Sequence, residues 1–199
     1  ATFNTNVASA LNGAVNAIAE LADGSVVVGG SFTNKLKMFN ADGTTTGVAA
    51  TFNTSVASAL DGTVKAVEVL DDGSVVVGGE FANRLMMFNA DGTTTTTEPA
   101  RTFNTNVGSS LNSDVLALGL TSGGSLVAGG YFNGKLKMFN ADGTTTGAAA
   151  VFNTNTSAIS GISSVYNLSI ARDDSIVAVG DIDHYVKRVN ADGTVTGDS

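Results

Sequence analysis

The feature of this sequence that most limits its fold is a fourfold internal repeat. The tetrapeptide [TV]FNT recurs with its phenylalanine at positions 3, 52, 103 and 152, at spacings of 49, 51 and 49 residues. An identical NADGT begins at positions 40, 89, 140 and 190, and an apolar run (SVVVGG, SVVVGG, SLVAGG, SIVAVG) ends in glycine at 30, 79, 130 and 180. These markers stay in register, so the chain is predicted to be one repeat domain, 1–199, of four units at about 1–50, 51–101, 102–150 and 151–199.

Each unit shows the pattern of short β-strands joined by tight turns. In the first copy, runs rich in β-branched residues cover 15–21, 25–30 and 35–40 and resume at Thr44, with turns at Ala22-Asp23-Gly24 and Asp42-Gly43. Asp-Gly between such runs predicts hairpins of type I′. Each copy is therefore expected to supply three hairpin-linked strands plus the segment that carries the phenylalanine.

The length of the unit favours a propeller blade. Units of 40 to 50 residues with short antiparallel strands are typical of blades, whereas a β-helix coil is about half as long. The run Val26-Val27-Val28 is apolar on both faces, as expected for a sheet packed between neighbouring sheets. The predicted fold class is all-β, a four-bladed β-propeller. Closure could place residues 2–4 beside a strand at 194–196, and a ring that stays open should oligomerise.

The repeat resembles a known family. The arrangement V.A….DGS.VVGG.F….L..FNADG….TFN is similar to the delta-60 repeat, a β-propeller-type repeat of bacterial and phage surface proteins, over nearly the whole chain. That family commonly has arginine ahead of the turn, as in RLNADG, and only Arg188-Val189-Asn190 approaches this here. The resemblance implies the fold and a virion or cell-surface setting, and little about activity.

Composition narrows the classes of partner. The formal net charge is −8, with 10 basic and 18 acidic side chains, which opposes binding to nucleic acid or to anionic membranes. The apolar runs are too short to span a membrane, so membrane insertion is not expected. There is no cysteine, which excludes disulfides and thiolate metal sites. The N-terminal Ala1 fits removal of an initiator methionine, loss of a leader or a chosen boundary equally well.

No cofactor, metal or catalytic group is predicted. The Asn-x-Asp-Gly turns partly match calcium loops, but they lack the first carboxylate, so a hairpin with Asx hydrogen bonds is favoured. His184, with Asp181 and Asp183, could hold a metal, although a solvated strand end is the favoured alternative. One histidine and no cysteine leave no nucleophile with a base, and Glu20, Glu68 and Glu80 do not occupy equivalent repeat positions.

Two sets of residues are candidates for binding. The first is a basic band on the third strand of each copy, suited to an acidic protein surface or an anionic glycan, or simply protecting outer edges from aggregation: Lys35, Lys37, Arg84, Lys135, Lys137, Lys187 and Arg188. The second is the residue after the glycine pair, which varies while its neighbours repeat, by selection or by neutral drift: Ser31, Glu80, Tyr131 and Asp181.

These features are compatible with three functions. The first is a non-enzymatic structural or recognition protein, most concretely a phage virion component such as a head decoration protein or a tail-associated adhesin. Its partners would be other protein surfaces, including capsid or tail proteins, or surface glycans, with homo-oligomerisation left open. The second is a secreted carbohydrate-binding propeller, in which Tyr131 stacks on sugars. The third is a carboxylate-dependent glycoside-processing enzyme. The expected location is the virion, the extracellular space or the cell surface.

Overall fold

The computed structural model describes residues 2–7, 9–94, 98–182 and 185–195, and they form four separate three-stranded antiparallel sheets. We call them blades 1 to 4, and in each the strands lie in chain order. Blade 1 contains β1 (Val15–Glu20), β2 (Val26–Gly30) and β3 (Leu36–Phe39); blade 2 contains β4 (Val64–Val69), β5 (Val75–Gly79) and β6 (Leu85–Phe88); blade 3 contains β7 (Val115–Leu120), β8 (Leu126–Gly130) and β9 (Leu136–Phe139); blade 4 contains β10 (Ile162–Ile170), β11 (Ile176–Ile182) and β12 (Val186–Val189). The predicted all-β fold of four blades is confirmed.

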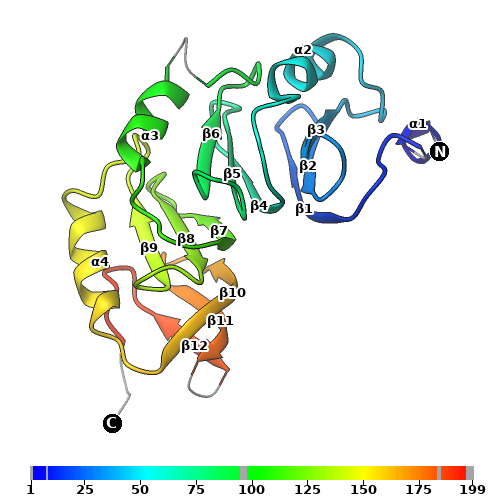
Figure 1. The fold of residues 1–199 in the computed structure, drawn as a ribbon. Coiled ribbons are helices and arrows are strands. Elements are labelled where there is room, and N and C mark those ends of the chain that lie inside the picture. Colours follow the sequence, from blue (N-terminus) through cyan, green and yellow to red (C-terminus); the bar gives the residue numbers. More distant parts are fainter. Residues whose placement is uncertain (1, 8, 95–97, 183–184, 196–199) are drawn as a thin grey trace.

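The blades follow one another around an open arc (Figure 1). Neighbouring blades meet through their first strands, β1 against β4, β4 against β7 and β7 against β10, and these line the inner side. Blades 1 and 4 are the two ends of the arc, so the described residues do not close a ring. None of the described helices is long and apolar enough to cross a membrane.

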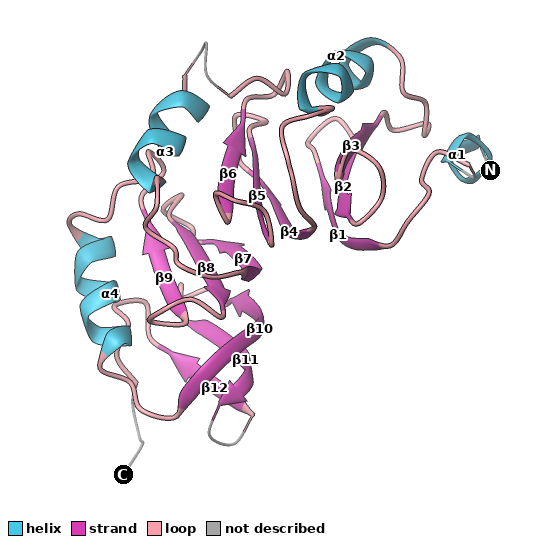
Figure 2. Ribbon diagram, in the orientation of Figure 1, coloured by secondary structure: helices cyan, strands magenta, loops and turns pink. Residues whose placement is uncertain are grey.

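A helix stands where the sequence predicted an extended segment. The helices are α1 (Thr2–Val7), α2 (Gly47–Val56), α3 (Ala100–Val107) and α4 (Ala148–Ser157), and they lie along the outer side of the arc (Figure 2). The prediction of an extended segment from Thr44 onward is wrong, because Ala49, Phe52 and Val56 recur at helical spacing and are all buried. Residues 2–4 are likewise helical and pack on blade 1, and residue 196 of the expected closing strand lies outside the described residues.

The hairpin turns also differ from the type predicted. Leu21 N–H donates to Ser25 and Gly24 N–H donates to Leu21, with φ +82° at Gly24 alone. This is a turn followed by a left-handed glycine, which is the pattern of longer β-hairpin loops, not the two-residue type I′ turn. In blade 4, Asp174 takes the glycine position with φ +59°. A type I′ turn would need positive φ at both central residues.

The hydrophobic core lies between blades. One cluster joins Val27, Leu36 and Met38 of blade 1 to Val64 and Val77 of blade 2 through the buried face of α2, and blades 2–3 and 3–4 repeat the arrangement. The apolar run at Val27 therefore meets a different neighbour on each face, as its sequence predicted.

An asparagine side chain in each of the last three helices binds the edge of the preceding sheet. The Oδ1 atom of Asn104 accepts from Met87 N–H at 2.7 Å, and its Nδ2 donates to the Met87 carbonyl at 2.8 Å. Asn53 binds Met38 and Asn153 binds Met138 in the same way. This asparagine clip satisfies backbone groups that an edge strand would otherwise leave unpaired.

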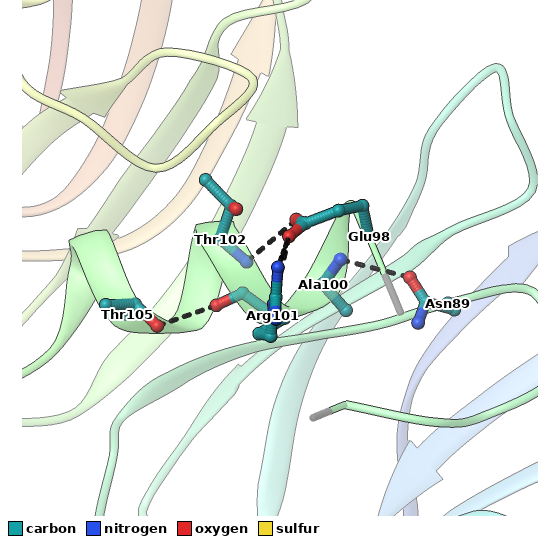
Figure 3. A network of polar contacts seen from close by, with 6 residues as sticks. All are labelled: Asn89, Glu98, Ala100, Arg101, Thr102 and Thr105. Atoms are coloured by element: carbon teal, nitrogen blue, oxygen red, sulfur yellow. Dashed lines mark hydrogen bonds and ion pairs between the residues drawn. The ribbon is translucent and has the colours of Figure 1, made fainter. Parts of the chain in front are cut away.

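In the second copy the asparagine of the NADGT turn binds the first residue of the following helix. Figure 3 shows Asn89 Oδ1 accepting from Ala100 N–H at 3.0 Å, at the first residue of α3. Glu98 accepts from Thr102 N–H and pairs with Arg101, so a carboxylate lies where the helix N-terminus has free donors. The hydrogen bonds of Asn89 and Glu98 thus help to fix where α3 begins.

Candidate functional site: the concave face

The inner strands of all four blades line one open cleft of about 700 Å³ on the concave side of the arc. Its wall includes Asn16, Lys65, Leu116 and Tyr166, each the second residue of the sequence Val-x-[Ala/Asn] in its copy. The four residues are all different, whereas the valine before them is the same in every copy.

These four residues are the extra residues of β-bulges. In blade 2, Val64 pairs with Gly79 and Ala66 pairs with Gly78, which leaves Lys65 without a partner on β5. The same shift isolates Asn16, Leu116 and Tyr166. A bulge re-aims the side chain of the extra residue, and bulges are common beside functional sites. The repeat therefore presents one variable side chain per blade at a fixed place in the cleft.

In blade 2 the bulge residue pairs with the variable residue that follows the glycine pair. Lys65 Nζ lies 3.0 Å from Glu80 Oε1, and the two side chains are 31% and 43% exposed. The pair is accessible to solvent, so it contributes little to stability and remains available to a ligand.

In blades 3 and 4 the residues at the equivalent positions form an aromatic cluster. The rings of Tyr131 and Tyr166 meet edge to face with centroids 6.1 Å apart. The Tyr166 hydroxyl donates to Asp181, and the Ser164 hydroxyl donates to the same carboxylate oxygen at 3.1 Å. The hydrogen bond to Asp181 raises the pKa of Tyr166, so the phenol stays protonated and acts as a donor. An aromatic surface with fixed hydroxyl and carboxylate groups suits a polar, partly apolar ligand.

The structure thus brings three of the four variable residues predicted from sequence into contact with bulge residues. Ser31 differs, because its contact is the backbone hydrogen bond from its N–H to the Ala14 carbonyl. Sequence reasoning missed the bulge residues themselves. The sequence did contain a signal for them. Like the residue after the glycine pair, the bulge residue differs in every copy while the valine before it stays the same.

The basic band predicted on the third strands lies on β3, β9 and β12 and at the residue before each of β3, β6 and β9. Lys37 and Lys137 donate to the carbonyls of Ala10 and Ser110 and lie over the rings of Phe39 and Phe139, and burial lowers the pKa of Lys137.

Other members of the band also have partners within the chain. Arg84 reaches Asp114 of the next blade at 2.6 Å, and Lys135 donates to the Tyr131 carbonyl. Lys187 is buried, Arg188 pairs with Asp173, and Lys35 has left-handed backbone with φ +62°. These contacts give the cations structural roles, and their role in binding stays a prediction.

The NADGT turns show the Asx hydrogen bonds expected of plain hairpin turns. Asp142 Oδ1 accepts from both the N–H and the hydroxyl of Thr144, and these bonds lower the pKa of Asp142. Within the described residues no three His, Cys, Asp or Glu side chains are grouped so as to hold a metal ion. Asp183 and His184 of the candidate metal cluster lie outside the described residues.

Glu68 is the half-buried acid of β4, and desolvation raises its pKa. It occupies the position that Gly119 has in blade 3, where an added Cβ would meet Leu168 and Ile170 of blade 4. By this equivalence Glu68 is directed toward the next blade and away from the cleft. Its raised pKa therefore follows from inter-blade packing.

Comparisons with known proteins agree on the fold. A family model described as "Domain of unknown function (DUF5122) beta-propeller" matches residues 21–45 and 70–96. No curated protein matches the sequence. Among solved structures, the WD40 β-propeller domain of Doa1 is similar with a TM-score of 0.57 and 15% identity over 89% of this chain and 51% of that one.

Two further structures extend this result. The nidogen/laminin complex gives a TM-score of 0.58 and 13% identity, covering 90% of this chain and 61% of that one. Virginiamycin B lyase from Staphylococcus aureus gives 0.54 and 13%, covering 92% and 54%. This chain therefore spans about half to three fifths of these three structures, and its four blades are packed as propeller blades.

Proposed function

We propose that this protein is a non-enzymatic structural or recognition module whose binding surface is the concave face. The observation that carries the proposal is the bulge in each inner strand, which holds a different side chain at an equivalent place in the cleft: Asn16, Lys65, Leu116 and Tyr166. Binding residues held by a rigid, repeated scaffold can vary without cost to the frame that supports them.

A photo-crosslinking amino acid placed on each side of the arc tests this surface. Leu116 lies on the cleft wall, and Val151 is 54% exposed on the outer helix α4, which makes it a matched control. Crosslinking in the native source should join position 116 to a defined partner and leave position 151 with scattered products. Equal product patterns from the two positions would remove the concave face as the binding surface.

The setting we propose is a phage virion, with the protein as a head decoration protein or a tail-associated adhesin that contacts capsid proteins, tail proteins or surface glycans. The similarity of the repeat to delta-60 repeats of bacterial and phage surface proteins supports this setting, as does the repeat-built, cysteine-free chain. Mass spectrometry of purified particles from the native source is the test. Particles that lack this chain would refute the virion setting and leave the concave-face proposal standing.

Carbohydrate is the second candidate ligand, because of the Tyr131–Tyr166–Asp181 cluster. Tyrosine rings stack on sugar faces, while the phenol and the carboxylate can bind hydroxyl groups. On an array of defined glycans, Tyr166→Ala should abolish binding and Tyr166→Phe should weaken it, since phenylalanine keeps the ring and loses the bond to Asp181. An array on which the unmodified protein binds no glycan would exclude this candidate.

A further inference from the structure

The three interfaces inside the arc share one pattern of contacts. The leading blade presents a surface that we call the acceptor face, which in blade 3 consists of Val127, Gly129, Leu136 and Met138. Blades 1 and 2 have Val, Gly, Leu and Met at the same places.

The following blade presents what we call the donor face: two aliphatic residues of its first strand together with the helix that precedes it. In blade 4 these aliphatic residues are Val165 and Leu168. A glycine in the acceptor face is required because a Cβ at Gly129 would lie 2.6 Å from Val165 Cγ1, and Gly29 and Gly78 are as tightly approached by the next blade.

Blade 1 carries a complete donor face that nothing in the described residues covers. Val15 is 46% exposed and Ile18 67%, whereas their counterparts in blade 2, Val64 and Val67, are 0% and 8% exposed. The helix α1 places the equivalent apolar residues, Phe3 and Val7, on blade 1, where they are half-buried and Phe3 packs edge to face on Phe39. Its Asn4 corresponds to the clip asparagines and is exposed.

Blade 4 does not offer a matching acceptor face. The glycine is replaced by Val179, the leucine by Val186 and the methionine by Arg188. Arg188 is held at the surface by Asp173 at 2.9 Å and by the Ser175 hydroxyl at 2.9 Å. In the geometry of the internal interfaces the side chain of Val179 would overlap the position that Val15 must take, and burying Arg188 would desolvate its charge. Blade 4 therefore cannot receive a donor face in the way that blades 1 to 3 do.

We infer that the donor face of blade 1 is a docking surface for a second protein chain of the same repeat type, whose exposed blade keeps the glycine, leucine and methionine that blade 4 has lost. The three internal interfaces define the contacts. The partner's glycine receives Val15 and Ile18, its leucine and methionine cover Phe3, and Asn4 clips the backbone of that methionine. The altered face of blade 4 prevents this chain from using itself as the partner.

A full-length variant with a restored acceptor face supplies the partner for a direct test. Val179→Gly, Val186→Leu and Arg188→Met rebuild the acceptor face, and Ile18→Glu in the same chain blocks its own donor face. Mixed with the unmodified protein, this acceptor variant should form a 1:1 complex of twice the 20.0 kDa chain mass, measured by light scattering. The unmodified protein alone should remain a monomer.

Matched variants assign the complex to the donor face. Ile18→Glu in the unmodified protein should abolish complex formation, and Asn4→Ala should weaken it about tenfold or more, as expected for the loss of two hydrogen bonds. Circular dichroism must first show that the acceptor variant is folded; if it is not, the Val179→Gly single change combined with Ile18→Glu replaces it. A folded acceptor variant that does not bind would overturn the inference. Dimerisation of the unmodified protein through Ile18 would also overturn it, in favour of a second copy as the partner.

Discussion

Replacing the clip asparagine of α3 should destabilise the protein far more than the same replacement in α1. Asn104→Ala removes two hydrogen bonds, of 2.7 and 2.8 Å, to the backbone of Met87, a residue that is 0% exposed. Each bond contributes about 0.5–1.5 kcal/mol net, and an unpaired buried group costs about 1–3 kcal/mol. We expect a loss of about 2–4 kcal/mol, or about 4–16 °C in Tm for a chain of this length.

Asn4→Ala is the matched control, because Asn4 holds the equivalent position in α1 and is exposed. We expect a change within about 0.5 kcal/mol, as is usual for surface positions. Urea unfolding followed by circular dichroism measures both variants, and hydrogen exchange of the Met87 amide reports the clip itself. That amide should exchange faster in Asn104→Ala. Equal losses in the two variants, or unchanged protection of Met87, would show that the clip does not carry this stability.

Three further predictions concern packing, acid and the inter-blade ion pair. Gly129→Ala should cost about 1–3 kcal/mol in urea unfolding, because its Cβ would lie 2.6 Å from Val165 Cγ1, whereas Gly123→Ala, with open space around it, should be neutral or slightly stabilising. The pKa of Asp142 is lowered from 3.8 in the folded state, so the stability that this carboxylate contributes is present above pH 3.8 and is lost as pH falls through the folded pKa. Between pH 7 and pH 3, the free energy of unfolding measured in urea should therefore fall less for Asp142→Asn than for the unmodified protein. Asp114→Asn should cost less than about 1 kcal/mol, and less still at high salt, since this partner of Arg84 is partly exposed.

The repeat frame determined most of what could be predicted from the sequence. Register markers, β-branched runs and Asp-Gly pairs were enough for the number of blades and for three strands in each. The helix was missed because Thr, Asn and Ser around Phe52 have weak helix propensity, and only the spacing of Ala49, Phe52 and Val56 indicates one. The helical conformation of this segment therefore depends on the packing of its buried residues against the strands of the two blades beside it.

The candidate site was predicted only in part for a similar reason. Variation at Glu80, Tyr131 and Asp181 could be seen in the sequence, and so could variation at Lys65 and Tyr166. What the sequence does not display is the bulge, since one unpaired residue in a strand has no periodicity of its own. Without the bulge, there was no reason to place Lys65 beside Glu80 or Tyr166 beside Asp181.

The bulge also explains how the repeat can keep the same residues between blades while one residue in each inner strand varies. Val64 and Val67 are buried against Gly29 of blade 1, and this close packing limits the size of the side chains that fit at the two positions. Lys65 lies between them in sequence but has no ladder partner on β5, and its side chain forms an ion pair with Glu80. A substitution at Lys65 therefore changes the surface of the cleft without changing the apolar contacts between blades, whereas Asn16 donates to the Val64 carbonyl of blade 2 and Tyr166 packs on Tyr131 of blade 3. If the concave face is the binding surface, as we propose, Lys65→Leu, which gives blade 2 the bulge residue of blade 3, should alter binding while leaving the free energy of unfolding nearly constant, because the exposed Lys65–Glu80 pair contributes little to stability.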